Sequence, residues 1–482
     1  PGHSSWSDAI DLLIRDVPNL TVYLNTEGTH PVMEGGTRIA AVEAENVITG
    51  ERFLFRAPLF ADCTGDGAIA YAAGCEYRVG QEGRDEFGES YAPERPTRET
   101  MGTSLLHRST RMPDPQPYTP PPFAVKFTAE HFVRRKANLV QGTWWIEYGG
   151  LKDTIQDAEH IRDELLRVVF GAFDWAKNHD PETREEAAYY KLTWVPTVAG
   201  KRESRRFVGD YILTQNDVES GRIFPDRVAF GGWPIDLHPA PGIYGKEIPP
   251  FTPFALKQPY SIPYRILYPK GVENLFMAGR HVSVTHVALG STRLMQTIGT
   301  MGQAVGAAAF LCRKYQVGPR GLYPARMPEL QQLLLKWDAY IPQVRNEDPG
   351  DLCRGARATA SSSCPAVVVA PGGREPAMER DAPCTTVRGQ SVMVADRGWR
   401  GIALYLCAAA NTEAELRVER VVEEEKTEPL WTVRVPLASG GFRWVDFPLP
   451  DELTPGEEYR VWLSANPHLT WKIFAGSGGE RY

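Results

Sequence analysis

ENLFMAGRHVSVTHVALGSTRLMQTIGTMGQAVGAAAFLCRKY, residues 273–315, is the stretch from which the rest of this chain can be interpreted. Residues 275–278 form a short apolar run typical of a buried strand, and Gly279 ends that run. After a loop rich in Ser, Thr and His, apolar residues recur with helical spacing from about residue 295 to residue 315. Basic residues in the last turn, followed by a Gly-Pro pair, are typical of a helix end. The stretch predicts a strand, a loop and a long helix.

Three glycines, Gly299, Gly302 and Gly306, lie on one face of this predicted helix. Each glycine inside a helix costs roughly 1 kcal/mol relative to alanine, so three together need a physical reason. Small residues let a second backbone or a flat ligand approach closely, and a helix N-terminus favours negative charge. The pattern therefore fits a flat ligand that becomes anionic, and it fits close packing of the helix on a sheet equally well.

Length and composition limit the possible classes. A chain of 482 residues predicts two or three domains, and 42% hydrophobic with 23% charged residues is ordinary for a soluble globular protein. The net charge of −7 argues against general binding to nucleic acid or to an anionic membrane. No apolar run approaches the ~20 residues of a membrane span. No HExxH, HxH or CxxC pattern occurs, which argues against a zinc site.

Seven cysteines are unevenly placed, and four of them (Cys353, Cys364, Cys384 and Cys407) fall in the last third of the chain. An even set in a small β domain would form one or two disulfides, which would indicate a secreted or periplasmic protein. Buried free thiols explain the same residues, so both alternatives stay open.

The first hundred residues predict a small antiparallel meander after a helix that ends near residue 17. Alternating patterns predict strands at residues 20–24, 38–45 and 52–60. The last strand leads into ADCTGDG, residues 61–67, and then into a small-residue helix at residues 68–74. Two glycines permit a tight turn whose N–H groups point outward, which predicts an anion cradle. Asp66 in this turn either caps the helix or contacts a ligand hydroxyl.

The middle of the chain predicts a surface excursion, a strand, a helix and a charge cluster. Residues 82–122 are polar and proline-rich, and Trp144, Trp145 and Tyr148 fall in a predicted strand that either stacks on a sugar ring or belongs to the core. Residues 153–177 predict a long helix. The predicted apolar face of this helix consists of Ile161, Leu165, Val169, Phe173 and Ala176.

Residues 194–210 hold the densest charge cluster, in which Glu203 lies among four cations: Lys201, Arg202, Arg205 and Arg206. Such a run is either a solvated surface or a network that supports a site, because guanidinium groups pair with carboxylate or phosphate. We favour the supporting network, since apolar residues and glycines enclose the run. The rigid stretch 231–263, which carries Trp233, Asp236, His238 and Tyr244, predicts the mouth of a substrate site.

Three segments together resemble a known family. ADCTGDG (61–67), GKRESRRFVGDY (200–211) and NLFMAGRHVSVTHVALGSTRLMQTIGTMGQAVG (274–306) are similar to bacterial FAD-dependent oxidoreductases with a glutathione-reductase-like flavin fold, many of them labelled xanthan-lyase-like. The resemblance covers roughly residues 6–315. It implies an α/β FAD-binding core split between residues 1–103 and 271–350, with a substrate-capping region at residues 104–270.

The resemblance also assigns site residues. It implies that Thr64, Gly65 and Asp66 lie near FAD, that Gly279 and Arg280 lie near its pyrophosphate or ribityl chain, and that Gln296, Thr297 and Gly299 lie near the isoalloxazine. His286 and Arg293, in the loop before the long helix, are the candidates for the substrate side and for catalysis. The reaction would be hydride transfer from an alcohol carbon to FAD, with His286 as base and with Arg293 or Arg280 stabilising the charge that develops.

One departure from the family concerns the start of the chain. The family opens with a strand and a GxGxxG turn that binds the AMP half of FAD, and no GxGxxG precedes the predicted meander here. The run at residues 55–63 also has the composition of a strand that is paired on both edges, because few charges or prolines interrupt its apolar residues. We therefore expect a further segment of about a hundred residues or more, upstream or on a partner chain, to carry that turn. The alternative is a cofactor-free carbohydrate-binding or scaffold protein that keeps the flavoprotein shape.

The C-terminal part, residues 351–482, predicts an antiparallel β-sandwich of jelly-roll type. Alternating strands are predicted at residues 391–394, 401–407, 415–421, 431–436, 442–447 and 459–464. Such modules accompany carbohydrate-active proteins, so a sugar or polysaccharide-derived substrate is expected. Five tryptophans in this part could stack on sugar rings, although core positions are expected for most of them: Trp399, Trp431, Trp444, Trp462 and Trp471.

Overall fold

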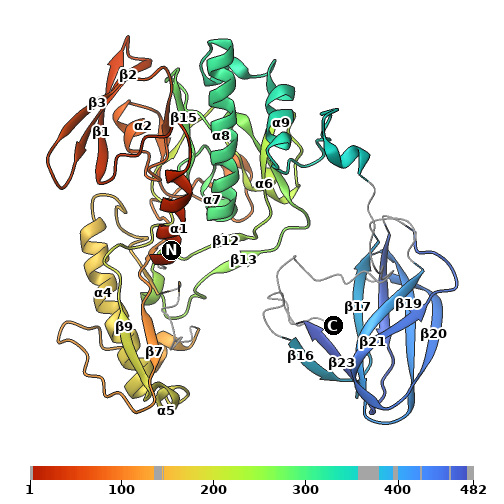
Figure 1. Cartoon of the computed structure of the whole chain (residues 1–482). Coiled ribbons are helices and arrows are strands. Elements are labelled where there is room, and N and C mark those ends of the chain that lie inside the picture. Colours follow the sequence, from red (N-terminus) through yellow and green to blue (C-terminus); the bar gives the residue numbers. More distant parts are fainter. Residues whose placement is uncertain are drawn as a thin grey trace. The chain divides into compact units, whose positions relative to one another are not determined.

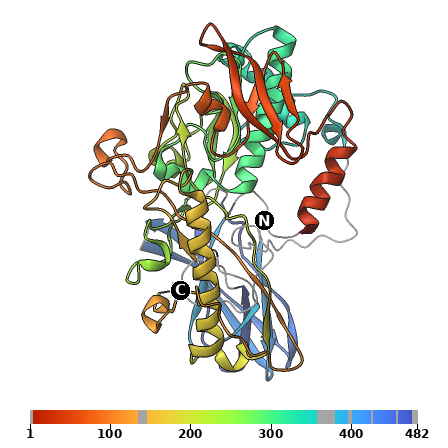
Figure 2. The same cartoon turned by 90° about the vertical axis from the view of Figure 1, so that its left-hand side faces the viewer.

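The computed structural model describes residues 4–134, 144, 146–356, 379–394, 400–423, 426–454 and 457–474. The chain divides into two compact units, residues 1–354 and 355–482, and each is described by itself. Figures 1 and 2 show the first unit with one antiparallel sheet at one end, made of β1 (Thr26–Glu34), β2 (Arg38–Asn46) and β3 (Arg52–Phe55). At the other end lie helix α4 (Ala158–Asp174) and strands β7 (Arg108–Arg111) and β9 (Tyr190–Trp194).

A parallel strand pair joins the two motifs that are farthest apart in the first unit. Strand β4 (Phe60–Asp62) lies beside β15 (Leu275–Met277), with Asp62 opposite Met277. All of β15 is buried, as its apolar run predicts. Helix α7 (His286–Thr292) follows, and α8 (Met295–Tyr315) has the predicted bounds (Figure 1). Among the described residues no strand pairs with the other edge of β4, so the GxGxxG segment stays a prediction.

The meander is present, but its first strand differs from the prediction. Helix α1 (Ser4–Arg15) is followed by β1 (Thr26–Glu34), β2 (Arg38–Asn46) and β3 (Arg52–Phe55) in one antiparallel sheet. The prediction of a strand at residues 20–24 was wrong. Tyr23 packs edge-on against the rings of Phe53 and Phe55, at 5.2 and 4.8 Å between centroids, so these apolar residues cover the sheet instead of joining it.

The single strand predicted at residues 52–60 is two strands. Its first part pairs with β2, and its last residue begins β4 in the parallel pair with β15. Pro58 lies between the two, and proline cannot donate a ladder hydrogen bond, which explains the break.

The predicted surface excursion at residues 82–122 was wrong for its first half. Met101 is fully buried, and so are the carboxylates of Glu82 and Glu89, whose residues are 5% and 1% exposed. The stretch includes α3 (Arg84–Phe87), β6 (Thr103–Ser104) and β7 (Arg108–Arg111). Polar residues are buried here because donors from distant segments satisfy them, which no local pattern reveals.

Helix α4 (Ala158–Asp174) buries the predicted apolar face, and a π-helical turn at Trp175–His179 extends it. It packs against Leu105, Ile146 and Ile243. Of the three aromatic residues predicted in a strand, Tyr148 lies in a strand, Trp144 lies in a turn, and Trp145 is outside the described residues. The remaining helices and strands of the first unit are β5 (Tyr77–Arg78), η1 (Ala129–Phe132), β8 (Glu147–Tyr148), α5 (Arg184–Ala187), β9 (Tyr190–Trp194), β10 (Arg206–Phe207), α6 (Gln215–Glu219), β11 (Arg227–Gly231), β12 (Ile235–Leu237), η3 (Gly242–Tyr244), β13 (Thr252–Phe254), β14 (Tyr260–Pro263), η4 (Tyr264–Ile266), η5 (Pro319–Leu322), α9 (Met327–Lys336) and η6 (Leu352–Gly355).

The second unit contains two four-stranded antiparallel sheets that share one apolar core. One sheet has the order β16 (Glu379–Pro383), β23 (Leu469–Phe474), β18 (Gly401–Ala408) and β21 (Gly440–Pro448). The other has the order β17 (Arg388–Met393), β22 (Glu458–Leu463), β19 (Thr412–Glu423) and β20 (Lys426–Leu437). All six predicted strands are present, and β16 and β23 are additional.

The tryptophans of the second unit have different environments. Trp471 lies in the core, Trp431 packs against its margin, and Trp462 donates its indole N–H to Glu419 at 3.0 Å. Trp444 is 50% exposed, and Trp399 lies outside the described residues.

We expect the second unit to fold without the first. Its core residues contact one another in a cluster of their own, so a fragment cut between residues 351 and 360 should unfold in one cooperative transition. Calorimetry of the fragment checks this, and a fragment without a heat-absorption peak would place the boundary elsewhere.

The cysteines favour the free-thiol alternative as far as the described residues reach. No disulfide is formed by the described cysteines, which are Cys63, Cys75, Cys312, Cys353, Cys384 and Cys407, and Cys364 lies outside the described residues. In the part of the chain that the structure describes, no helix is both long and apolar enough to cross a membrane.

Candidate functional site

The turn after β4 is organised by Asp62, a residue that the sequence did not single out. Its carboxylate accepts the backbone N–H groups of Ile69 and Ala70, both at 2.9 Å, at the start of α2 (Ala68–Ala72). It also accepts from the N–H and hydroxyl of Thr64 at 3.0 and 2.7 Å, and the Thr64 hydroxyl accepts from Ala68. The chain therefore fills the N-terminus of α2 itself, so the predicted anion cradle depends on the N–H groups of the turn before the helix.

Asp66 does not cap α2, because the capping residue is Gly67 and the first turn is bonded by the side chains of Asp62 and Thr64. Its carboxylate instead accepts from Lys201 at 2.6 Å, Ser204 at 2.7 Å and Arg280 at 2.6 Å. Burial raises the pKa of Asp66, but these hydrogen bonds and the nearby cations outweigh it, so the pKa is below its usual value. Asp66 thus ties the turn to the charge cluster and to the end of β15.

Free donors remain in the same turn. The backbone N–H groups of Gly65, Asp66 and Gly67 have no acceptor among the described residues. Gly65 has φ +78°, and a Cβ there would lie 2.2 Å from the guanidinium of Arg280. Glycine at this position is therefore required for Arg280 to close over the turn. Consecutive free N–H groups beside a cation suit an anionic or polyhydroxylated ligand chain.

The glycine face of α8 is open. A Cβ built at Gly299, Gly302 or Gly306 would meet no atom of the described residues within 4 Å. The alternative that these glycines pack the helix against a sheet of the described chain was therefore wrong, and the packing face is the opposite one, with Met301, Ala304 and Leu311. Gln296 is exposed, Thr297 is buried, and no side chain caps the first turn of α8. This end of the helix and its glycine face are free to receive a flat ligand.

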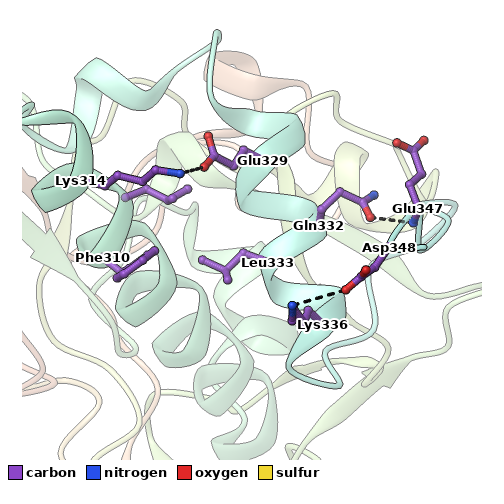
Figure 3. A pocket seen from close by; sticks show the side chains of 9 residues that line it. Phe310, Lys314, Glu329, Gln332, Leu333, Lys336, Glu347 and Asp348 are labelled. Carbon is purple, nitrogen blue, oxygen red and sulfur yellow. Dashed lines mark hydrogen bonds and ion pairs between the residues drawn. The ribbon is translucent and has the colours of Figure 1, made fainter. Parts of the chain in front are cut away.

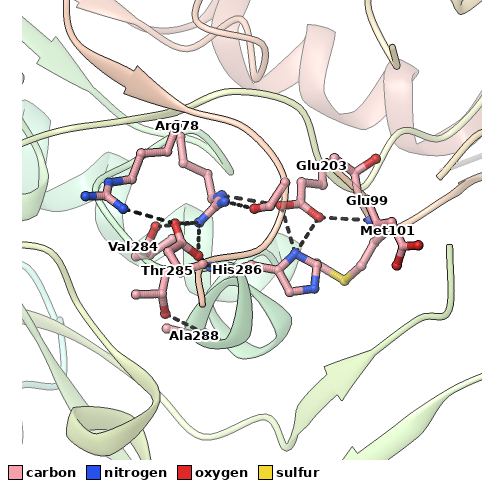
Figure 4. Close-up of polar contacts among 12 residues, drawn as sticks. Arg78, Glu99, Met101, Glu203, Val284, Thr285, His286 and Ala288 are labelled. Carbon is pink, nitrogen blue, oxygen red and sulfur yellow. Dashed lines mark hydrogen bonds and ion pairs between the residues drawn. The ribbon is translucent and has the colours of Figure 1, made fainter. Parts of the chain in front are cut away.

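His286, the first residue of α7, is 3% exposed and points at Glu203 from the charge cluster (Figure 4). Its ring nitrogen Nδ1 lies 3.0 Å from one carboxylate oxygen and 2.9 Å from the other. The other nitrogen, Nε2, has no hydrogen-bond partner among the described residues, and the side chain keeps 4% exposure. A carboxylate on Nδ1 fixes the ring so that Nε2 is the reactive atom.

Glu203 is completely buried and is held by charge and by backbone. It accepts the N–H of Met101 at 2.9 Å, and the Nε of Arg206 lies 3.3 Å away. Burial raises the pKa of Glu203, but His286 and Arg206 outweigh it and hold the pKa below its usual value. The carboxylate therefore stays ionised, which is what a group that orients an imidazole requires.

Arg206 is the centre of this network. It is 1% exposed, and its guanidinium donates to Glu82 at 2.8 Å and to the carbonyl of Val284 at 3.1 Å. Glu82 in turn accepts the backbone N–H of His286 at 2.9 Å. The charge cluster thus supports the start of α7 and is not a solvated surface.

A second buried cluster forms around His238. Its Nδ1 contacts Glu147, and its Nε2 lies 3.3 Å from Asp236. Arg293 follows directly after α7, and its Nη2 lies 3.1 Å from the carbonyl of Asp236 and 3.4 Å from its carboxylate. Burial, with the neighbouring Arg202, lowers the pKa of Arg293 to about 10. Asp236, His238 and Arg293, which separate sequence patterns singled out, therefore meet in one place.

Two other residues of the predicted mouth lie apart from this cluster. The hydroxyl of Tyr244 donates to Glu164 on α4, and the carbonyl of Trp233 accepts from Ser291 at 2.6 Å. Glu147 belongs to the cluster, but the sequence analysis did not single it out. The one feature that could have indicated it is its position as an acidic residue in a predicted strand rich in aromatic residues. Glu82 and Glu89 gave no signal, because the groups that hydrogen-bond to them, on Arg206 and Gln215, are more than a hundred positions away.

A surface hollow of about 390 Å³ between α8 and α9 is a different feature (Figure 3). Four of its charged residues form two pairs, Lys314 with Glu329 at 2.6 Å and Lys336 with Asp348 at 3.5 Å. Since these four groups satisfy one another, they do not converge on the hollow as free polar groups. Among the described residues, no group of three or more His, Cys, Asp or Glu side chains is arranged to hold a metal ion.

Comparison with known proteins gives one result. No curated protein and no solved structure matches the chain. The family model described as FAD dependent oxidoreductase matches residues 3–334, which is more than half of the chain and includes β4, the charge cluster, α7 and α8. The chain therefore belongs to the family of FAD-dependent oxidoreductases, and FAD is its cofactor.

Proposed function

We propose that this protein oxidises an alcohol carbon of a sugar or polysaccharide-derived substrate and that His286 is the base. The observation that carries the proposal is the buried pair of His286 and Glu203, in which Nε2 is left without a partner. An imidazole whose Nδ1 is held by a buried carboxylate presents Nε2 to accept a hydroxyl proton. The family membership supplies the redox partner.

The residues present fit FAD. Free backbone N–H groups in the turn of Gly65 and Asp66, with Arg280 beside them, would hold its polar chain. The uncapped start of α8, with Gln296, Thr297 and the open face of Gly299, would receive its ring. Thr64 and Gly279 act indirectly: the Thr64 hydroxyl is bonded within the turn, and a Cβ at Gly279 would lie 2.7 Å from His281. When bound, FAD supplies an acceptor for two electrons as hydride.

The residues of the chain contribute a base that accepts one proton and groups that stabilise the charges formed in the reaction. The substrate O–H bond breaks and its proton goes to Nε2 of His286, while the hydrogen of the adjacent C–H bond leaves with its electron pair as hydride and a C=O bond forms. Glu203 accepts the Nδ1–H and stabilises the imidazolium that results. Arg280 lies beside the cofactor turn, which favours it over Arg293 as the residue that balances charge on the cofactor side.

Anaerobic mixing of the holoprotein with candidate alcohols tests this function. A substrate should bleach the flavin absorption and yield the corresponding carbonyl compound, and replacing hydrogen by deuterium at the reacting carbon should slow the bleaching. A holoprotein that no sugar or polyol reduces, but that a thiol or an amine reduces, would contradict alcohol oxidation.

The glycine face of α8 gives a separate prediction. Gly299→Val places a side chain in space where the described chain has no atom, so the protein should fold normally. If the ring of FAD lies on this face, the variant should purify colourless. Gly306→Val, about two turns further along the same open face, is the matched control and should keep its flavin. A folded and fully yellow Gly299→Val variant would show that the ring lies elsewhere.

A further inference from the structure

The cluster around His238 holds two acids and two arginines that the reaction at His286 does not use. One imidazole bridges Glu147 and Asp236, and Arg202 lies 3.2 Å from the same Glu147 oxygen that contacts His238. Arg293 lies 3.4 Å from Asp236. The cluster thus holds two carboxylates and two guanidinium groups around one imidazole.

Three polar atoms of this cluster are left over. Oε2 of Glu147, Oδ1 of Asp236 and Nε of Arg293 are buried and have no partner among the described residues. The side chain of Glu147 is 1% exposed, so solvent does not reach it freely. A buried polar group without a partner costs free energy, and three in one cluster indicate a place built for a bound molecule.

The left-over atoms specify the chemistry of that molecule. They are two acceptors, on the carboxylates, and one donor, on the guanidinium. The unpaired oxygens of Glu147 and Asp236 would repel a carboxylate or phosphate on the ligand. The guanidinium groups of Arg293 and Arg202 would repel an ammonium group. A hydroxyl group both donates and accepts and carries no charge, so neighbouring hydroxyls on one molecule satisfy all three atoms.

An aromatic wall adjoins the same cluster. Trp144 is 42% exposed, and its ring lies edge-on to His238, with 5.2 Å between centroids, and 4.9 Å from the ring of Phe251. Trp144 also presents its carbonyl to Arg202 at 2.7 Å. An exposed aromatic face beside a few placed polar groups offers a sugar both surfaces it needs: apolar packing for its C–H face and hydrogen bonds for its hydroxyl edge.

We propose that Glu147, Asp236 and Arg293 form a subsite that binds neighbouring hydroxyls of an uncharged sugar, with Trp144 against the sugar ring. The inference rests on the proposed function, because it names the substrate class of the same site: neutral pyranosides, in preference to uronic acids and amino sugars. Arg293 follows α7, which begins with His286, so the anchored sugar and the base are set by one helix.

Isothermal titration of the flavin-loaded full chain tests the subsite with three sets of probes. They are neutral hexoses and pentoses with their methyl glycosides, the corresponding uronates and amino sugars, and tetrahydropyran-2-methanol, which has one hydroxyl. At least one neutral sugar should bind, with its charged counterparts and the single alcohol at least about tenfold weaker. Asp236→Asn should weaken that binding about tenfold or more. A charged sugar that binds as tightly, or a panel in which no neutral sugar binds, overturns the subsite.

Trp144→Ala keeps the test decisive if the buried variants fail to fold, because this side chain is half-exposed. It should weaken sugar binding severalfold, whereas Trp194→Ala, also 42% exposed but on β9 beside Arg108, should leave it unchanged. Equal binding by both variants overturns the subsite. Sugar binding without flavin reduction would contradict the proposed function and support the subsite. Alcohol oxidation that is insensitive to Trp144→Ala and Asp236→Asn would support the proposed function and contradict the subsite.

Discussion

Replacing His286 with alanine should lower turnover on the native substrate by roughly 10²-fold or more and leave the flavin content unchanged. The reason is that Nε2 is the free nitrogen of a ring already held by Glu203. Steady-state kinetics, together with the flavin absorbance per protein, measures both quantities. Parallel loss of flavin and activity would make His286 a binding or folding residue, and unchanged turnover would remove it from the mechanism.

Two further substitutions separate chemistry from packing. His286→Asn keeps a side-chain N–H near the position of Nδ1 and removes Nε2, so it should stay folded and still be slow. His160→Ala removes an exposed histidine on α4, which contacts Tyr148 through ring edges only, and should leave turnover unchanged.

Replacing Glu203 with alanine should lower the free energy of unfolding by about 3–5 kcal/mol, because it leaves Arg206 and His286 in a buried site without their carboxylate. Urea denaturation measures the loss. Glu329→Ala is the matched control: Glu329 also pairs with a cation and has a lowered pKa, but its side chain is one-third exposed. Its loss should stay below ~1 kcal/mol. Equal losses for the two variants would contradict the buried-network interpretation.

The lowered pKa of Glu203 also predicts how stability depends on pH. A carboxyl group whose pKa is lower in the folded state stabilises the fold above its unfolded pKa of about 4.3, and this contribution is lost as the pH falls through the folded pKa. The unfolding free energy should therefore decline below about pH 4.5 less steeply in Glu203→Gln than in the parent. The same variant should alter the pH profile of turnover, because the amide no longer stabilises the imidazolium at His286.

The sequence by itself determined the features that depend on neighbours in the chain. The apolar run of β15 and the helical spacing of α8 predicted their positions, and the face of α4 from Ile161 to Ala176 was predicted in full. Six strands of the second unit were found from alternation. These patterns succeed because burial of one face imposes a period of 2 or 3.6 on local residues.

Only the tertiary structure decided which groups meet. Three buried acids are paired with residues that are distant in the chain: Glu82 with Arg206, Glu147 with His238 and Glu203 with His286. From the sequence alone, such an acid cannot be distinguished from one on the surface. Local rules left Asp66 as either a helix cap or a ligand contact. In the structure its carboxylate accepts from Lys201, Ser204 and Arg280 instead, and two of these donors add opposite charge. The open glycine face of α8 follows the same logic: spacing located it, but only the packing of the opposite face showed that it is free.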